Sequence, residues 1–369
     1  MRHSSSLEIN LSYLSENFEK IGTLAKKSRI LPMVKADAYG NGLVPISQHL
    51  LNDCEVKTLG CASLGEALII KRECPQNDFE VMVFSDTEIQ NPEHRKNYEQ
   101  FKLTPVIHQR SDFLAFESDP RLKRVPLVLK VNTGMNRLGL SLEDLEVMLP
   151  ALKNRGVKHL MTHFACSYYP SKPGDKTERQ LKEFEKAKTL LRDAGVSVEE
   201  TSVSNSGAIE QGIGIEETWV RPGLMLYGPY SVSQETWGGH QISSLKTSVL
   251  KTFLVKKGTP VGYGVNVAPE DLFIALLPLG YGDGLLTFAG GASLWVKGVE
   301  GKIFGRVNMD MTFLSFPAEK AGILKEGETV EIWDNNNQTI SDLAAQMKTI
   351  PYQLMCAISP RIPRIYKVQ

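Results

Sequence analysis

The stretch PMVKADAYGNG, residues 32–42, introduces the pattern from which the fold is predicted. It lies at the end of an apolar run that starts at Ile30, reaches Lys35 directly after Val34, and closes in a Gly-Asn-Gly turn. Lysine is almost never fully buried without a partner, so it suits the end of a buried strand only where that end opens onto a polar site. The stretch therefore predicts a buried strand with a functional amine at its carboxyl end.

Similar apolar runs recur up to residue 228 and alternate with segments of helical pattern. A short apolar run bounded by turn residues is typical of a buried strand. The predicted strands are ILPMVKA (30–36), TLGCAS (58–63), FEVMVFS (79–85), LTPVIHQ (103–109), PLVLKVN (126–132), HLMTHFA (159–165), EETSVSN (199–205) and WVRPGLMLYG (219–228). Predicted helices between them include 43–53, 64–73, 88–100, 141–154 and 177–194.

Eight strand–helix units in succession favour a (β/α)8 TIM-type barrel, a fold of roughly 250 residues. A doubly wound open sheet is the structural alternative, because it also alternates strands with helices. From residue 235 onward the chain instead shows alternating, aromatic and β-branched stretches with glycine turns, as in LFIALLPLGYGDG (272–284). We therefore predict two domains, a barrel over residues 1–234 and an all-β domain over residues 235–369.

Composition narrows the possible partners and the compartment. The 369 residues include 42 Lys+Arg and 42 Asp+Glu, so the net charge is zero and no basic surface for nucleic acid is expected. No run approaches the 18 apolar residues of a membrane span, and the first twenty residues lack the apolar core of a secretory signal. The five cysteines are odd in number and lack metal-ligand spacing. We expect a cytoplasmic protein with no bound metal, no membrane and no nucleic-acid partner.

Chemically active residue types gather where the predicted strands end, which is where barrel enzymes place their active sites. Loops after the seventh and eighth strands often bind phosphate through backbone N–H groups at a short helix. A phosphate pocket beside a strand-end lysine indicates a Schiff base with a phosphorylated aldehyde, namely pyridoxal phosphate. The residues are Lys35, Lys130, Arg137, His163, Asn205, Ser206, Gly207 and Arg221 at strand ends, with Gly223, Leu224 and Tyr39 as further phosphate contacts.

Each of these residues has an ordinary interpretation when taken alone. A lysine after a strand is usually a solvated surface residue, and His163 alone would be a polar residue packed in the barrel. Arg137 alone would be a member of a surface ion pair, and SNSG would be an ordinary turn. Their joint placement at the ends of five predicted strands favours the functional interpretation.

Several segments resemble those of the alanine racemase family, in the same order along the chain. The resemblance extends from about residue 7 to residue 366 and implies a pyridoxal-phosphate-dependent isomerase. The segments are MVKADAYGNG (33–42), KVNTGMNRLG (130–139), THFA (162–165), SNSGA (204–208), VRPGLMLYG (220–228), VGYG (261–264), GYGDG (280–284) and GRVNMDM (305–311).

The resemblance implies a role for each matching residue. Lys35 would hold the cofactor as a Schiff base and act as the base on the D face of alanine, and Tyr263 would act as the base on the L face. Arg221 would lie against the pyridine nitrogen, and Lys130 matches a position that is carbamylated in some members. The remaining roles are phosphate or ring contacts for Tyr39, His163, Asn205, Ser206, Gly223 and Leu224, and substrate contacts for Arg137, Met309, Tyr281 and Asp310.

The family also implies a homodimer in which the second subunit's β domain completes each active site. The product, D-alanine, would supply cell-wall peptidoglycan. Three positions depart from the family pattern: Ser202 stands where many members have a histidine bonded to the arginine, Pro360 where many have a phosphate-binding tyrosine, and Asn308 where cysteine is frequent.

Three other functions are compatible with parts of the sequence. A racemase of broader range would act on serine, lysine or arginine. A decarboxylase of the same architecture would normally place an acidic residue, rather than Arg221, at the pyridine nitrogen. A pyridoxal-phosphate homeostasis protein would share the barrel and its lysine but would lack the β domain that carries Tyr263.

Overall fold

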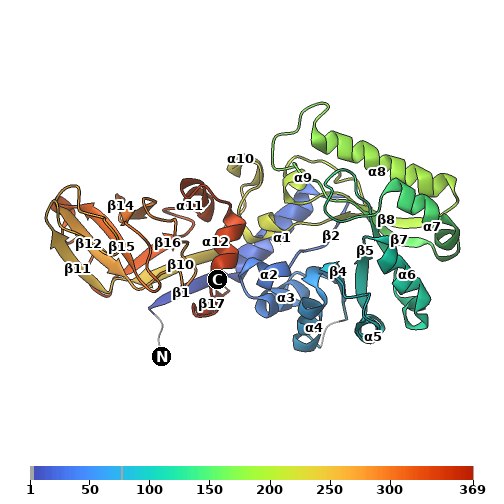
Figure 1. The fold of residues 1–369 in the computed structure, drawn as a ribbon, viewed down its shortest axis with the longest axis horizontal. Coiled ribbons are helices and arrows are strands. Elements are labelled where there is room, and N and C mark those ends of the chain that lie inside the picture. Colours follow the sequence, from blue (N-terminus) through green and yellow to red (C-terminus); the bar gives the residue numbers. More distant parts are fainter. Residues whose placement is uncertain (1–3, 76–77, 369) are drawn as a thin grey trace. The chain divides into compact units, whose positions relative to one another are not determined.

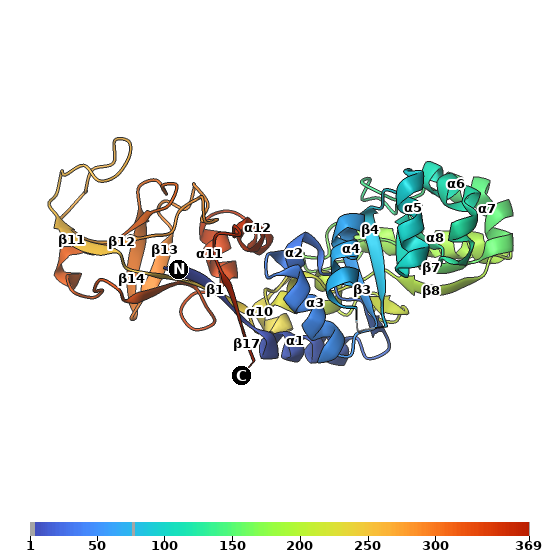
Figure 2. The same cartoon turned by 90° about the horizontal axis from the view of Figure 1, so that it is seen from below.

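A computed structural model describes residues 4–75 and 78–368, which fall into two compact units. The barrel unit comprises Ser15–Ala38 and Gly42–Gly239. The β unit comprises the described residues up to Leu14, Tyr39–Asn41, and those from His240 onward. Figures 1 and 2 show the elements of both units in two views.

Among the described residues, eight parallel strands close the barrel unit. Six form one sheet in the order β3-β4-β5-β6-β7-β8, and β2 pairs with β9. Val34 N donates to Gly60 O at 2.8 Å, which joins the β2 end to β3, and Arg221 N donates to Ser204 O at 2.9 Å, which joins β9 to β8. The predicted barrel is confirmed and the open-sheet alternative is wrong. The strands are β2 (Arg29–Ile30), β3 (Thr58–Ser63), β4 (Glu80–Asp86), β5 (Leu103–Ile107), β6 (Val128–Lys130), β7 (Val157–Met161), β8 (Val198–Ser202) and β9 (Trp219–Val220).

Helices surround these strands (Figure 1). Two begin with a capping box, in which a serine and an acidic residue satisfy each other's backbone N–H groups: Ser63 with Glu66, and Ser141 with Asp144. The helices are α1 (Leu11–Leu24), α3 (Leu43–Asn52), α4 (Leu64–Glu73), α5 (Pro92–Gln100), α6 (Arg110–Ser118), α7 (Leu142–Arg155), α8 (Lys176–Asp193), α9 (Ser206–Glu210) and α10 (Gln234–Trp237), with 3-10 turns η1 (Pro120–Arg124) and η2 (Leu224–Tyr227).

The eighth predicted strand is much shorter than expected. β9 stops at Val220, and the following Leu224–Tyr227 form the 3-10 turn η2. Pro222 lacks a backbone N–H and cannot continue a hydrogen-bonded ladder, although its carbonyl still accepts from Met33 N at 3.0 Å. The predicted apolar run was therefore a strand followed by a buried turn.

An apolar cluster fills the barrel and determines which side chains reach the site. It comprises Leu31, Met82, Val106, Val128, Met161 and Trp219, with Phe84 packed against it. Because side chains of a strand alternate between faces, residues two positions further along share the inward face. Lys130 follows Val128, His163 follows Met161 and Arg221 follows Trp219 at that spacing, so the three polar residues lie one layer nearer the carboxyl ends of the strands.

The described part of the β unit contains two sheets. One has the strand order β16-β10-β1-β17, and the other, fully antiparallel, has the order β11-β12-β15-β14-β13. The β domain is confirmed, but the sequence pattern did not predict two short helices, α11 and α12, nor that the N-terminal strand β1 pairs with β10. The elements are β1 (Ser5–Asn10), β10 (Ser243–Ser248), β11 (Lys251–Val255), β12 (Leu272–Leu277), β13 (Ser293–Val296), β14 (Val299–Phe304), β15 (Thr312–Pro317), η3 (Ala318–Lys320), β16 (Thr329–Trp333), α11 (Ile340–Gln346), α12 (Pro351–Ala357) and β17 (Arg364–Lys367).

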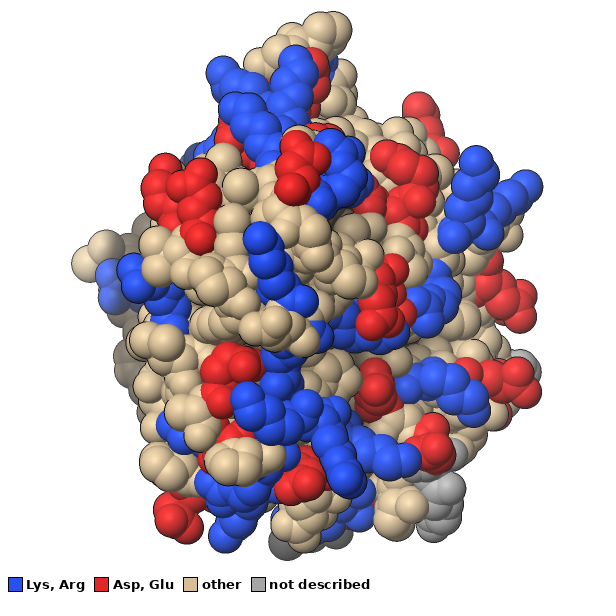
Figure 3. Space-filling view, turned by 90° about the vertical axis from the view of Figure 1, so that its right-hand side faces the viewer, with Lys and Arg blue, Asp and Glu red and all other residues tan. Residues whose placement is uncertain are grey.

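Two surface properties bear on the expected partners. On the face shown in Figure 3, basic and acidic side chains are intermixed. Within residues 4–75 and 78–368, no helix combines the length and apolarity needed to cross a bilayer.

Candidate functional site

Lys35 begins a turn of left-handed helix, α2 (Lys35–Tyr39). Ala36, Asp37 and Ala38 have φ angles of 54°, 55° and 52°, and Tyr39 has 55°. Each non-glycine residue in this conformation is disfavoured by about 1–2 kcal/mol, so the surrounding structure must hold the turn. The backbone after β2 therefore leaves the barrel abruptly at Lys35.

Two acidic side chains hold this turn. Glu66 accepts the backbone N–H of Ala36 at 2.6 Å, and its other oxygen accepts Ala62 N at 2.8 Å. Asp37 Oδ1 accepts the N–H of Leu43, the first residue of α3, at 2.7 Å. Sequence reasoning did not identify Glu66, although its capping-box spacing from Ser63 was a readable signal.

Arg221 is held rigidly at the end of β9. It is 4 % exposed, and its guanidinium donates to the carbonyls of Thr162 and Val203 and to Ser202 Oγ. Burial lowers the pKa of Arg221 to about 10, which still leaves it protonated near neutral pH. The described contacts thus include no carboxylate on this buried cation.

The charge of Arg221 acts on both Lys130 and His163. Burial and the charges of Arg221, Arg137 and Lys35 lower the pKa of Lys130 to about 8. Burial, Arg221, Lys130 and Lys35 lower the pKa of His163 well below its usual value. The structure therefore brings five predicted site residues together, namely Lys35, Lys130, Arg137, His163 and Arg221. Every charge that shifts the pKa values of Lys130 and His163 is positive. Such a cluster suits an anionic ligand.

Arg137 lies on the exposed loop that follows β6. Asn132 Oδ1 accepts the backbone N–H groups of Gly134 and Asn136, at 3.1 and 3.0 Å, and shapes this loop. Gly139 is required where the loop returns, because a Cβ there would lie 2.5 Å from Asn132 N. The NTGMNRLG motif is thus a folded loop that presents Arg137 beside the strand ends.

The predicted phosphate contacts other than Tyr39 lie in the barrel unit. Ser206 Oγ accepts the N–H of Gly223 at 3.0 Å and that of Met225 at 3.3 Å. Asn205 caps α9 by accepting Ala208 N at 3.2 Å. The loops after β8 and β9 are therefore joined at Ser206, with Leu224 adjacent in sequence.

The predicted substrate residues of the β unit lie on neighbouring loops. Tyr263 is 73 % exposed, and its carbonyl accepts Asn266 Nδ2 at 2.9 Å. A Cβ on Gly305 would lie 2.9 Å from the same Asn266 nitrogen, so the two loops touch. Tyr281 N donates to Asn308 O at 2.9 Å, which places Tyr281 beside the Met309 loop.

The other predicted residues of the β unit have different surroundings. Tyr39 is buried, its ring centroid is 5.8 Å from that of Tyr352, and burial raises the pKa of its phenol. Asp310 and Pro360 are exposed. The phosphate contact of Tyr39 and the substrate contact of Asp310 remain predictions, as do the cofactor and substrate roles of the other site residues.

Ser202, one of the departures, bonds to a residue that sequence reasoning missed. His159 Nε2 lies 2.7 Å from Ser202 Oγ. The period-two spacing of His159 and Met161 was the available signal, because it places His159 on the inward face of β7.

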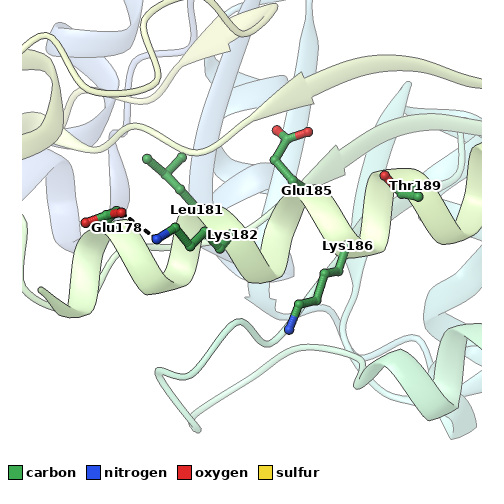
Figure 4. A pocket seen from close by; sticks show the side chains of 6 residues that line it. All are labelled: Glu178, Leu181, Lys182, Glu185, Lys186 and Thr189. Atoms are coloured by element: carbon green, nitrogen blue, oxygen red, sulfur yellow. Dashed lines mark ion pairs between the residues drawn. The ribbon is translucent and has the colours of Figure 1, made fainter. Parts of the chain in front are cut away.

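A hollow on the outer surface of α8 is separate from these residues (Figure 4). It is lined by consecutive turns of one helix, and Lys182 pairs with Glu178 at 2.6 Å across it. This pairing is usual for a solvated helix face.

Comparison with known proteins agrees with this geometry. The chain matches the family profiles described as "Alanine racemase, N-terminal domain" over residues 9–231 and "Alanine racemase, C-terminal domain" over residues 242–366. It is 30% identical to the alanine racemase of Marinobacter nauticus, covering 97% of this chain and 98% of that protein. It is also 30% identical to that of Carboxydothermus hydrogenoformans, with 97% and 98% covered.

Solved structures show the same fold. The biosynthetic alanine racemase of Pseudomonas aeruginosa superposes with a TM-score of 0.86 at 26% identity, covering 99% of this chain and 100% of that one. The alanine racemase of Bartonella henselae, solved with covalently bound pyridoxal phosphate, gives a TM-score of 0.87 at 22% identity, with 99% and 100% covered.

Proposed function

The chain belongs to the alanine racemase family of isomerases, and we propose that it interconverts L-alanine and D-alanine with pyridoxal phosphate bound at Lys35. The observation that carries the proposal is the cluster of Lys35, Lys130, Arg137 and Arg221 at the strand ends. A cofactor phosphate and a substrate carboxylate are the anions that such a cluster would take. The covalently bound cofactor of the Bartonella henselae relative supports the same assignment.

The residues at the strand ends fit the cofactor. Ser206, Gly223, Leu224 and Tyr39 would hold its phosphate, supported by Asn205 at the start of α9. His163 would lie against the cofactor ring. The lowered pKa of His163 keeps its imidazole neutral among the surrounding cations. Bound pyridoxal phosphate supplies an electron-withdrawing ring that makes the α-proton of an attached amino acid acidic.

Arg221 would donate a hydrogen bond to the ring nitrogen without giving up its proton. Its pKa of about 10 leaves it charged at neutral pH, and no acidic partner is among its described contacts. A donor of this kind leaves the ring nitrogen unprotonated, which weakens electron withdrawal and limits side reactions. This property distinguishes the proposed racemase from a decarboxylase of the same architecture.

Two side chains would move the α-proton. Tyr263 Oη would remove it from the L face and Lys35 Nζ would return one to the D face, so that the substrate need not turn over. Arg137 and the backbone N–H of Met309 would bind the substrate carboxylate. Tyr281 and Asp310 would line the entrance and the substrate pocket.

Lys130 is a candidate for carbamylation. Its pKa of about 8 gives a larger neutral amine fraction near neutral pH than an ordinary lysine has, and the neutral amine is the form that reacts with carbon dioxide. The resulting carbamate would be anionic beside Arg137 and Arg221, and would orient Arg137 toward the substrate.

We further propose a homodimer in which a second copy's β unit completes each site. Tyr263 and Met309 are 73 % and 59 % exposed, and the neighbouring Val265 is 97 % exposed. A catalytic tyrosine on an exposed apolar surface is suited to contact with another subunit. The product D-alanine would serve peptidoglycan synthesis in the cytoplasm.

Borohydride reduction followed by peptide mapping tests cofactor attachment. The phosphopyridoxyl group should appear on Lys35, and a label on any other lysine would refute the assignment. Racemisation assays with alanine, serine, lysine and arginine then test the substrate. Turnover of alanine alone supports the proposal, whereas equal turnover of serine or a basic amino acid would indicate the broader-range racemase.

Mixed dimers test the shared site. Lys35→Ala and Tyr263→Ala proteins should each be nearly inactive. After subunit exchange, the mixed dimer should contain one intact site, and random pairing should restore up to roughly a quarter of the wild-type activity. Exchange without any recovery would exclude the shared arrangement.

A further inference from the structure

Three buried polar side chains form a hydrogen-bonded chain that ends at Arg221 of the cationic cluster. Arg221 Nη1 donates to Ser202 Oγ, and His159 Nε2 lies 2.7 Å from the same oxygen. His159 is 1 % exposed and Ser202 is 0 % exposed. His159 and Ser202 lie on the paired strands β7 and β8, and Arg221 directly follows β9 and is joined to the end of β8 through Ser204 O, so the spacing of the three residues is set by the barrel itself.

The direction of the hydrogen bond from Arg221 follows from the chemistry of the guanidinium. A guanidinium only donates, so Ser202 Oγ accepts from Arg221. Ser202 Oγ has a second lone pair, so its hydrogen bond with His159 can run in either direction; in the direction that we adopt, the hydroxyl proton points to His159, Nε2 is unprotonated and the ring proton is on Nδ1. Burial and the charge of Arg221 lower the pKa of His159 to about 3, so the ring remains an acceptor at neutral pH.

The position of His159 is itself fixed by Trp219. The rings of His159 and Trp219 stack with centroids 6.5 Å apart and planes 14° apart. Trp219 Nε1 donates to Glu200 Oε2 at 2.8 Å, which fixes the indole. Within the described residues, His159 Nδ1 has no hydrogen-bond partner, so the only polar contact of this buried ring is the one to Ser202.

We propose that His159 is a positioning residue for Arg221 and acts through Ser202. By accepting the hydroxyl proton, His159 turns the lone pairs of Ser202 toward the guanidinium and fixes the direction in which Arg221 points. The pair thereby supports Arg221 although position 202 carries a serine. The catalytic consequence rests on the proposed function, in which Arg221 faces the ring nitrogen of the cofactor, but the positioning itself does not.

Nitrogen-15 NMR of apoprotein labelled in histidine and arginine tests the positioning without the cofactor. We expect the His159 ring to carry its proton on Nδ1 and the guanidinium protons of Arg221 to exchange slowly with solvent. In His159→Leu, whose side chain fills similar space without an acceptor, these protons should exchange at least about tenfold faster. Ser202→Ala should have the same effect and serves if His159→Leu does not fold.

The chain offers a matched control in His49→Leu. His49 is also buried, and its Nε2 lies 2.7 Å from a serine hydroxyl, that of Ser15. This pair joins α1 and α3 rather than the strand ends, so its loss should leave Arg221 exchange unchanged. Unchanged exchange in both His159→Leu and Ser202→Ala, or equally faster exchange in His49→Leu, would overturn the proposal.

Holoenzyme kinetics test the consequence. His159→Leu should lower kcat about tenfold, which corresponds to roughly 1.4 kcal/mol, while KM for alanine stays within about twofold and the visible absorption of the cofactor shifts. His159→Gln, whose amide oxygen can accept from Ser202, should restore most of both readouts. A wild-type protein that neither binds pyridoxal phosphate at Lys35 nor racemises alanine would refute the proposed function, whereas the apoprotein measurement would still decide the role of His159.

Discussion

Replacing Glu66 by glutamine should loosen the left-handed turn that follows Lys35. Glu66 Oε1 accepts Ala36 N at 2.6 Å, while Oε2 accepts Ala62 N at 2.8 Å and Ser63 N at 3.2 Å. Glutamine has only one acceptor oxygen. Because glutamine serves in a capping box, we expect that oxygen to stay with Ser63 and the amide NH2 to face the N–H of Ala36.

The size of the effect follows from these contacts. A hydrogen bond to a charged group contributes about 1.5–3 kcal/mol. Ala36 is exposed, so water can replace part of the lost bond, and the lower end of that range applies. A loss of about 1.5 kcal/mol corresponds to roughly tenfold more frequent local opening of the turn.

Hydrogen–deuterium exchange of a peptide spanning residues 35–42 measures this opening. Exchange in Glu66→Gln should be roughly tenfold faster than in the wild type. Asp144→Asn is the matched control, because Asp144 forms the equivalent capping box with Ser141 on α7 and does not bond to the turn. If Glu66→Gln leaves exchange unchanged, or Asp144→Asn accelerates it as much, Glu66 does not hold the turn.

Three further predictions concern the site residues. Tyr263→Phe should slow exchange of the α-proton of L-alanine with deuterated solvent by roughly 10²–10⁴-fold and leave exchange of the α-proton of D-alanine intact. Equal loss of exchange from both enantiomers would exclude two separate bases. The pKa of Lys130 is about 8 in the folded protein and 10.5 in the unfolded chain. Between pH 8 and pH 10.5 the unfolded chain therefore binds more protons, and the unfolding free energy of the apoprotein should rise with pH over this range. Lys130→Met should remove up to ~3 kcal/mol of this rise in denaturant titrations, and an unchanged pH profile would contradict the shift. Ser206→Ala leaves the N–H groups of Gly223 and Met225 without their acceptor and should weaken pyridoxal-phosphate binding about tenfold by absorbance titration, whereas wild-type affinity would exclude Ser206 from the phosphate site.

Much of the barrel and its strand-end residues could be predicted from the sequence. Apolar runs bounded by turn residues located the eight strands, because buried parallel strands need apolar side chains on both faces. The predicted run 58–63 coincides with β3, and the predicted segment 64–73 coincides with α4. Since the carboxyl ends of parallel strands meet at one end of a barrel, Lys35, Lys130 and Arg221 could be grouped without coordinates.

Long-range contacts decided the features that the sequence did not predict. Strand β1 lies between β10 and β17, and the partner of Leu7 in β10 is Leu245. Such pairings cannot be read from local pattern, because any alternating strand presents the same unpaired N–H and C=O groups.

The sequence alone thus determined the succession of strands and helices and the set of cationic residues, because each depends on local pattern and on the repeat of the barrel. Only the tertiary structure decided the left-handed turn after Lys35 and the chain from His159 through Ser202 to Arg221. Local preference disfavours left-handed alanine and the burial of an imidazole without full hydrogen bonding. Both occur here because contacts from other strands and helices, which no local pattern encodes, outweigh those preferences.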